Sequence, residues 1–303
     1  MARFGVIDLG SNSVRLVVYD VKEAAPSPRF RTVVDEKKMA GLAAYVVEGV
    51  FTPEGLRRAE SILASQLKTA RTLRCERIDI FATAVLRNCV NSAEAVTALE
   101  EAIDHPINLL SAREEAHLGF VGATLGQPLE AGTLIDIGGG STELTVLRAT
   151  GDADGVSLPQ GSVSSYAQFV SLVLPTAAEC AAIEESLRGH LDGLGTLAPY
   201  RTAHLFGIGG SVRAVAKMQA QALGVGGKPP LITRQNLQAL FALFAEEPSR
   251  FAHSAVKACP DRVHTLVPGM VMVRTLMDCL GADDLTVCKY GIREGYLVDR
   301  MLK

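Results

Sequence analysis

Two short turns in this sequence, each preceded by an aspartate, have the composition of an anion-binding site. Their residues are small, so that their N–H groups can point at one anion, and glycine lets the backbone approach phosphate oxygens without strain. A tight hairpin would explain either turn alone, but two matching turns, each with an aspartate, favour a phosphate site. The first turn contains Ser11, Asn12 and Ser13 after Asp8, and the second contains Gly138, Gly139, Gly140, Ser141 and Thr142 after Asp136.

A third glycine-rich segment, Gly207-Ile-Gly-Gly-Ser-Val-Arg, joins an apolar strand-like run to the start of a helix. Helix N-termini bind anions through their free amide donors and the helix dipole. Gly209, Gly210 and Ser211 are therefore candidate phosphate ligands, with a helix capped by Ser211 after a flexible loop as the competing interpretation. The segment is not a P-loop and lacks a complete G-x-G-x-x-G, which argues against dinucleotide binding.

Carboxylates near these turns could supply hydrolytic chemistry. Cleavage of a phosphoanhydride needs positive charge on the phosphoryl oxygens and a group that orients water, and carboxylate oxygens suit Mg²⁺. Glu114 has a competing structural role, because Ser111-x-x-Glu114 is a capping box. Arg87 follows a strand-like run and could meet phosphate, although taken alone a solvated arginine is the simpler interpretation. The candidate carboxylates are Asp8, Asp136, Glu143 and the Glu114–Glu115 pair.

Strands and helices alternate along the chain and predict an α/β fold. Residues 4–20 have the pattern of strand, turn and strand, and residues 134–147 repeat it, with the two aspartates 128 residues apart. The repetition indicates two copies of one domain type, divided near Gly126-Gln-Pro, and Pro26-Ser-Pro predicts a surface loop. Helices are expected at about 52–74, 92–103, 111–123, 176–194, from 212, 235–245, 267–280 and 291–302.

The bulk properties restrict the partners of this 303-residue chain. With 48% hydrophobic residues and a net charge of −3, it can form packed cores but exerts no overall attraction on nucleic acid or anionic membranes. Binding of phosphate must therefore depend on groups within the binding site itself, since the net charge of the chain does not attract anions. There is no signal-peptide pattern and no uninterrupted run of ~18 apolar residues, so we expect a cytoplasmic protein without a membrane span. The six cysteines form no Cys-x-x-Cys pair, and we interpret them as reduced thiols.

Taken together, these motifs resemble the exopolyphosphatase / guanosine pentaphosphate phosphohydrolase (Ppx/GppA) family, over nearly the whole chain. One such motif would be weak evidence, but six in the family's order are specific. They are Ile7-Asp-Leu-Gly-Ser-Asn-Ser, Ala82-Thr-Ala-Val-Leu-Arg, Glu114-Glu-Ala, Ile135-Asp-Ile-Gly-Gly-Gly-Ser-Thr-Glu-Leu, Gly207-Ile-Gly-Gly-Ser-Val-Arg and Gly291-Ile-Arg-Glu-Gly.

The resemblance implies two ribonuclease-H-like domains of the actin/sugar-kinase superfamily with the active cleft between them. They would span residues 1–126 and 127–290, with a C-terminal helix at 291–303 packing back on the first. It also implies dependence on Mg²⁺ or Mn²⁺, with a monovalent cation as a further candidate. The short two-domain form suggests a weaker grip on very long chains than in longer members, or reliance on a homodimer.

The resemblance assigns a role to each candidate residue. Glu114 would orient or deprotonate water, with Glu115 as the alternative, and Arg87 would contact the substrate chain. Asp136 and Glu143 would be catalytic and metal-associated, Asp8 would also bind metal, and the three small-residue segments would bind phosphate. Arg262-Val-His stands where the family often has Arg-Ala-Asp, which leaves a role for His264 open.

We therefore expect an exopolyphosphatase that releases orthophosphate from the end of inorganic polyphosphate by attack of a metal-assisted water. The runner-up is hydrolysis of guanosine pentaphosphate (pppGpp), which would connect the protein with the stringent response. A non-catalytic polyphosphate or nucleotide sensor is the competing class. A kinase of the same broad fold is disfavoured, because no acceptor-sugar motif is evident.

Overall fold

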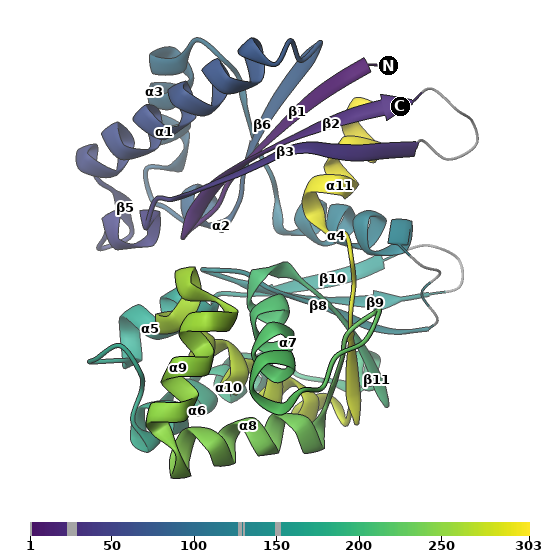
Figure 1. Ribbon diagram of the computed structural model, residues 1–303. Helices are drawn as coiled ribbons and strands as arrows, with labels where there is room; N and C mark the ends of the chain where they lie inside the picture. The colour runs from purple at the N-terminus through teal and green to yellow at the C-terminus, as the bar shows by residue number, and fades with distance from the viewer. Residues whose placement is uncertain (1, 23–28, 127–128, 130, 149–152) are drawn as a thin grey trace. The chain divides into compact units, whose positions relative to one another are not determined.

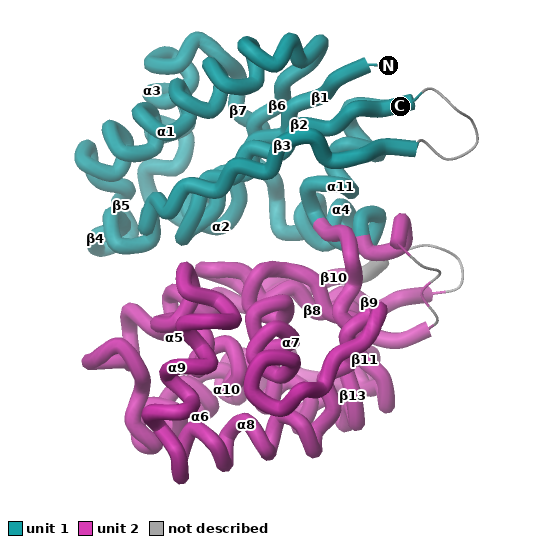
Figure 2. The backbone as a smooth tube through the Cα atoms, in the orientation of Figure 1, with its two compact units in different colours: residues 1–122, 292–303 teal, residues 123–291 magenta. Residues whose placement is uncertain are grey.

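The protein is described here by a computed structural model that covers residues 2–22, 29–126, 129, 131–148 and 153–303. The chain forms two compact units, shown in separate colours in Figure 2. Unit 1 contains residues 1–122 and 292–303, and unit 2 contains residues 123–291. The Pro26-Ser-Pro loop, and the Gln127-Pro128 part of the segment where a domain boundary was predicted, lie outside the described residues.

Unit 1 is built on a five-stranded sheet of order β3-β2-β1-β6-β7. The first three strands are antiparallel neighbours, whereas β6 runs parallel to β1 and β7 parallel to β6. A two-stranded ribbon of β4 and β5 lies outside this sheet. The strands are β1 (Ala2–Leu9), β2 (Ser13–Lys22), β3 (Arg29–Met39), β4 (Val46–Val47), β5 (Val50–Phe51), β6 (Arg77–Ala82) and β7 (Ile107–Leu109).

Both faces of the unit 1 sheet are covered, as Figure 1 shows for the helices on either side of it. Because successive residues of a strand point to opposite faces, Ile7 of β1 packs into one core cluster and Val6 into another. Helices on the first face are α1 (Pro53–Thr72), α2 (Ala84–Arg87) and α3 (Ser92–Ile103), and on the second α4 (Ala112–Gly126), α11 (Ile292–Tyr296) and a π-helical turn at Leu297–Met301.

Unit 2 repeats this topology in a sheet of order β10-β9-β8-β11-β13-β12. Again three consecutive strands are antiparallel neighbours, and two later strands, β11 and β13, run parallel to the first of them. The extra edge strand β12 is antiparallel to β13. The strands are β8 (Gly132–Ile137), β9 (Thr142–Leu147), β10 (Ala153–Leu158), β11 (His204–Ile208), β12 (Leu231–Thr233) and β13 (Asp284–Val287).

The repeated strand order confirms the predicted α/β class with two ribonuclease-H-like halves. The largest core cluster lies in unit 2, where Ile135 of β8 and Leu144 of β9 pack with residues of its helices. The unit 2 helices are α5 (Ser162–Phe169), α6 (Ala177–Asp192), α7 (Gly209–Leu223), α8 (Arg234–Glu246), α9 (Pro248–Ala258) and α10 (Val263–Leu280).

Several helices begin where the sequence predicted them. Thr52 caps α1 by accepting a hydrogen bond from the Gly55 amide at 3.2 Å, with Pro53 in the first turn. The predicted closing helix at 291–302 is less regular, because it divides into α11 and the π-helical turn. Three further helices, α2, α5 and α9, were not predicted from the sequence.

One helix in the described part of the chain, Pro260–Leu280, is long and apolar enough to cross a membrane by composition. The segment is not an uninterrupted apolar run in the sequence, because Arg274 and other polar residues interrupt it. Within the structure, 72% of its apolar window is buried, and Val267 and Met270 of α10 pack in the unit 2 core. This is the burial expected of a core helix.

Candidate active site

The second predicted turn lies between β8 and β9, with an acidic residue on each strand. Asp136 and Glu143 are register partners in this antiparallel pair, so their side chains project from the same face of the sheet. Ile135 and Leu144 point to the core, and the two carboxylates therefore lie on the opposite face. Glu143 is 2% exposed, and its Oε1 accepts a hydrogen bond from Ser157 Oγ at 2.8 Å.

The third predicted segment meets this turn because β11 lies beside β8, with Ile208 opposite Asp136. Gly209 follows at φ +88°, and a side chain there would place Cβ only 2.2 Å from Asp136 Oδ1. The Asp136 carboxylate therefore lies against the Gly209 backbone, at the N-terminus of α7. Only glycine combines this left-handed backbone with the space that the carboxylate requires.

The first turn of α5 packs against the Gly138–Ser141 turn, which the sequence analysis did not anticipate. The amides of Ser162 and Val163 donate to the carbonyls of Gly138 and Gly139 at 3.0 and 2.9 Å. Ser211 Oγ, at the start of α7, donates to Ser162 Oγ at 2.8 Å. Both serines are buried, so these hydrogen bonds fix the two glycine-rich segments relative to each other. In the sequence, the small residues Gly161 and Ser162 after β10 could have indicated this contact.

A cation also reaches this part of unit 2. A Cβ added to Gly210 would lie 2.1 Å from Arg262 Nη2, so the Arg262 guanidinium lies directly over the Gly210 backbone. In the sequence, Arg262 is notable only as part of a departure from the family pattern. The structure thus collects glycine-rich backbone, an arginine and two carboxylates in one unit, which is the composition expected of a phosphate site.

The first predicted turn lies in unit 1, between β1 and β2. It is closed by a hydrogen bond from the Gly10 amide to the Ser13 carbonyl at 3.2 Å, and the Asn12 carbonyl accepts from the amides of Ala40 and Gly41, each at 2.9 Å. Asn12 is 9% exposed, and its Nδ2 is buried without a hydrogen-bond partner among the described residues. A buried donor without an acceptor is costly, and a bound phosphate oxygen would remove that cost.

Asp8, which precedes this turn, is held by the C-terminal segment. Arg293 Nη1 of α11 donates to Asp8 Oδ2 at 2.7 Å, and both side chains are largely buried. Burial acts to lower the pKa of Arg293, but the negative charges of Asp8 and Glu294 outweigh it and raise that pKa. Glu294 in turn accepts a hydrogen bond from the hydroxyl of Tyr19 at 2.8 Å. One oxygen of Asp8 is therefore already neutralised by a fixed cation.

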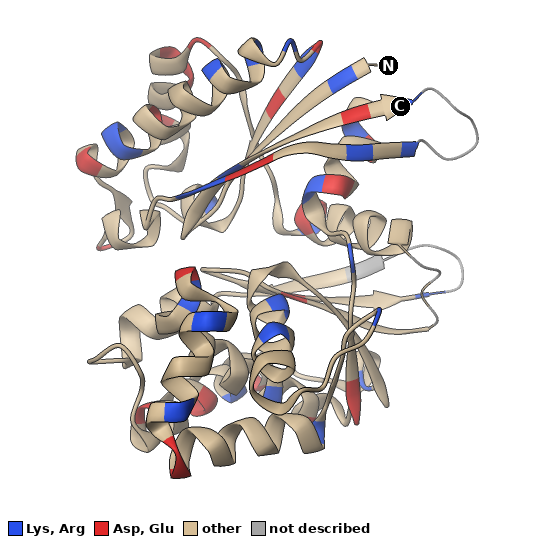
Figure 3. Cartoon of the chain, viewed as in Figure 1, with Lys and Arg blue, Asp and Glu red and all other residues tan. Residues whose placement is uncertain are grey.

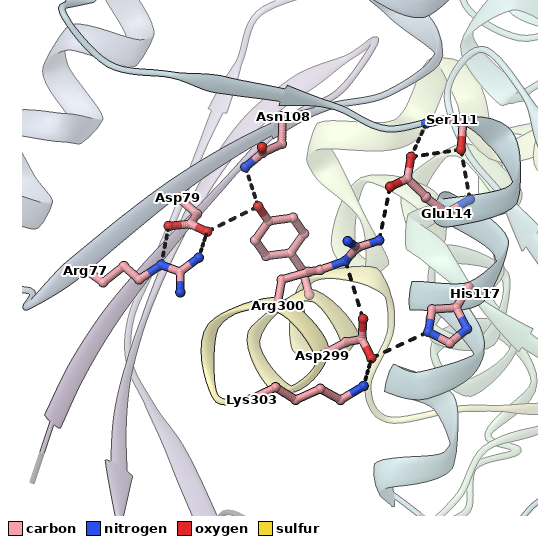
Figure 4. A network of polar contacts seen from close by, with 10 residues as sticks. Arg77, Asp79, Asn108, Ser111, Glu114, His117, Asp299, Arg300 and Lys303 are labelled. Carbon is pink, nitrogen blue, oxygen red and sulfur yellow. Dashed lines mark hydrogen bonds and ion pairs between the residues drawn. The ribbon is translucent and has the colours of Figure 1, made fainter.

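Glu114 forms the capping box that the sequence offered as its alternative role. Its Oε2 accepts hydrogen bonds from the Ser111 amide at 3.0 Å and from Ser111 Oγ at 2.8 Å, and Arg300 Nη2 donates to its Oε1 at 3.0 Å, as Figure 4 shows. The hydrogen bonds from Ser111, with a smaller effect of Arg300, hold the pKa of Glu114 below its usual value. Glu114 is thus ionised at neutral pH and positioned at the start of α4.

Glu115 is the more buried of the two glutamates, at 9% exposure. Arg87 Nη1 donates to its Oε2 at 2.6 Å and to the Leu110 carbonyl at 3.1 Å. Arg87 is therefore not a solvated arginine, and its contacts in unit 1 are with protein groups. This ion pair connects the end of α2 with the start of α4.

No group of three or more His, Cys, Asp or Glu side chains in the described parts of the chain is placed to hold a metal ion. Asp136 and Glu143 nevertheless suit Mg²⁺, because this ion is commonly bound by one or two carboxylates with substrate phosphates and water in its remaining positions. Asp8 suits it less well, since Arg293 occupies one of its oxygens. The carboxylates that suit a magnesium ion are therefore those of Asp136 and Glu143 in unit 2.

The family model described as the Ppx/GppA phosphatase family matches residues 17–303. The chain belongs to the Ppx/GppA phosphatase family. This confirms the family that the sequence motifs indicated. The match begins within β2, and it therefore leaves out β1, the turn that follows it and the first four residues of β2.

Ppx/GppA relatives are similar along almost the whole chain, at modest identity. A Haemophilus influenzae relative is 26% identical over 96% of this chain and 89% of its own length. Exopolyphosphatase 1 of Mycobacterium tuberculosis is 23% identical over 99% of this chain and 88% of its own.

Solved structures of Ppx/GppA proteins share the fold. The Aquifex aeolicus family member has a TM-score of 0.77 at 22% identity, covering 99% of this chain and 98% of its own. An exopolyphosphatase from Cytophaga hutchinsonii has a TM-score of 0.82 at 21% identity, covering 98% and 96%. At these identities the likeness establishes the fold alone.

Proposed function

We propose that this member of the Ppx/GppA family is an exopolyphosphatase, which hydrolyses the terminal phosphoanhydride bond of inorganic polyphosphate and releases orthophosphate. The observation that carries the proposal is the convergence in unit 2 of Asp136, Glu143, the Gly138–Ser141 turn and Gly209. The names of relatives such as Exopolyphosphatase 1 support the same substrate class.

The binding part of the proposal rests on donors fixed before substrate arrives. The amides of the glycine-rich segments and the Arg262 guanidinium beside Gly210 would bind the phosphoryl oxygens on which charge accumulates during cleavage. In unit 1, the side-chain amide of Asn12 would donate a hydrogen bond to a phosphate oxygen. Because these groups are held by the fold, they need little rearrangement during the reaction.

The carboxylates have a separate role. Asp136 and Glu143 would hold Mg²⁺ or Mn²⁺, which when bound neutralises phosphate charge and polarises the bond to be cleaved. The hydrogen bond from Ser157 Oγ would fix the orientation of Glu143 as a ligand. Asp8, bound to Arg293, would position the first turn.

For the residue that orients the attacking water, we propose Glu114, with Glu115 as the alternative. Glu114 is ionised, and its side chain is 41% exposed, so a water molecule can reach it. Its lowered pKa makes it a weak base, which suits a role in orienting water rather than in removing a proton early. Glu115 is less accessible, because its side chain is only 10% exposed and is paired with Arg87.

The test is release of orthophosphate in the presence of Mg²⁺ from long polyphosphate, guanosine pentaphosphate and ATP, with wild type, Glu114→Gln and Glu115→Gln in parallel. We expect release from polyphosphate and a loss of about 10²-fold or more in kcat for Glu114→Gln, with binding retained. A loss confined to Glu115→Gln would move the role to that residue, provided that its melting temperature is unchanged.

The comparison of the three substrates decides between the candidate functions. Release mainly from the nucleotide would make guanosine pentaphosphate the substrate, and binding without release from any of the three would identify a sensor. A homodimer and a cytoplasmic location stay predictions, which sedimentation and fractionation would test.

A further inference from the structure

A cavity of about 770 Å³ lies in unit 2, beside the outward face of α7 and apart from the two carboxylates. Its size is in the range of ligand-binding pockets. On α7, positions 213, 216, 217 and 220 fall on one side of the helix by their spacing. The segment before β12, the end of β13 and the two residues after β13 form most of the remaining wall. Small and apolar residues of the lining include Gly126, Ala216, Pro229 and Val287.

The charges around this cavity have one sign. Arg213, Lys217, Lys228 and Lys289 line it, and among the residues that the structure describes no aspartate or glutamate does. Helix α7 carries both of its charges here and has no acidic residue, as the blue positions on it in Figure 3 indicate. Within the described residues, no carboxylate forms an ion pair with any of the three lysines, in a chain whose net charge is −3. Apolar walls next to like charges strengthen their field.

Helix α7 connects the cavity to the phosphate site described above. The helix begins at Gly209 and Gly210, against Asp136 and Arg262. At a rise of 1.5 Å per residue, Arg213 lies about 5 Å and Lys217 about 11 Å further along the axis than Gly210. An anion held at the start of α7 could therefore extend along the helix and reach both basic residues.

The chemistry of the lining favours a phosphate chain over a nucleobase. Among the described residues no aromatic side chain lines the cavity, so a base would have no ring on which to stack. The ring of Tyr290, which follows Lys289 in the chain, is covered by the ammonium of Lys289 at 4.7 Å. Lysines bind phosphate as point charges without demanding one geometry, which suits a linear polyanion.

We propose that this cavity is a second site for a phosphoanhydride chain, which holds a stretch of the substrate away from the end that is cleaved. The inference rests on the proposed function, because it assigns the chain's terminal phosphate to the glycine-rich segments. The second site adds affinity for long chains only, since a short chain held at the start of α7 does not extend past Lys217. The second site would thus place the preference for long polyphosphate chains in unit 2.

The test uses the full-length double variant Lys217→Ala/Lys228→Ala, with Lys68→Ala/Arg71→Ala on α1 as a control that removes the same charge from exposed positions. For the first variant we expect KM for long polyphosphate to rise about tenfold with kcat unchanged, and a weaker salt dependence of that KM. KM for tripolyphosphate should change by less than twofold. The control should leave both values at wild-type level.

Binding is measured separately, by calorimetry with long polyphosphate in the absence of metal. Weaker binding by the Lys217/Lys228 variant would support the site even if no chain is hydrolysed, so that failure of the proposed function and failure of this inference are distinguishable. Equal binding and equal KM across chain lengths for both double variants would overturn it. A KM increase for guanosine pentaphosphate but not for long polyphosphate would also overturn it, because the short phosphate groups of the nucleotide do not extend past Lys217.

Discussion

The contact between Gly209 and Asp136 makes Gly209→Ala the most informative single change. An alanine there must adopt φ +88°, which costs an L-residue about 1–2 kcal/mol of folding free energy. Its Cβ would also lie 2.2 Å from Asp136 Oδ1, whereas atoms in ordinary contact lie about 3.5 Å apart. The Asp136 carboxylate must therefore move by about 1 Å or more.

A displacement of about 1 Å in a catalytic group costs about 10²-fold in rate, which corresponds to about 2.7 kcal/mol in the activation barrier. We expect Gly209→Ala to lose that factor in kcat/KM for polyphosphate. The assay is orthophosphate release at saturating Mg²⁺, corrected for the folded fraction from chemical denaturation of the same preparation.

Gly224, at the other end of α7, is the matched control. It also has a positive φ, +69°, but an added Cβ there would meet nothing within 4 Å. Gly224→Ala should thus lose a similar folding free energy, about 1–2 kcal/mol, and keep its activity. If Gly209→Ala retains a kcat/KM within about threefold of Gly224→Ala, the position of Asp136 does not control the reaction and the reasoning is refuted.

Three further outcomes are expected. Arg293→Met should cost about 3–5 kcal/mol in the free energy of unfolding, because it leaves the Asp8 carboxylate without its buried partner; in urea denaturation, adding Asp8→Asn should recover part of the loss, and no recovery would contradict the pairing. Glu179 accepts hydrogen bonds from the Thr176 amide at 2.7 Å and from Ser171, which lower its pKa to about 2. A carboxylate with a lowered pKa stabilises the fold fully above its usual pKa of 4.5 and loses that effect as the pH falls through about 2. The melting temperature of Glu179→Gln should therefore lie below wild type at pH 7 and converge with it near pH 2, whereas a pH-independent difference would argue against the linkage. Chelation of divalent cations should abolish phosphate release, and Asp136→Asn should raise the Mg²⁺ concentration needed to restore it by about 10–100-fold; full activity in excess chelator would exclude the metal role.

The local pieces of the site could be predicted from the sequence, because each depends on neighbours in the chain. The glycine-rich turn between Asp136 and Glu143 forms a hairpin as its composition requires. The Ser111–Glu114 capping box follows from a spacing of three residues. The repeated strand–turn–strand pattern indicated the duplicated fold. Such a pattern can be read from the sequence, because alternation of apolar and polar residues, or a continuous apolar run, is a feature of each single strand.

The tertiary structure decided which of these pieces meet. Asp136 contacts Gly209 only because β11 inserts beside β8, and strand order is not encoded in the periodicity of either strand. Arg262 over Gly210, and Arg293 on Asp8 across a separation of 285 residues, depend likewise on where helices return to the sheet. Sequence by itself therefore determined the chemical groups and their local backbone, whereas packing between distant segments decided their partners, their burial and hence their pKa values.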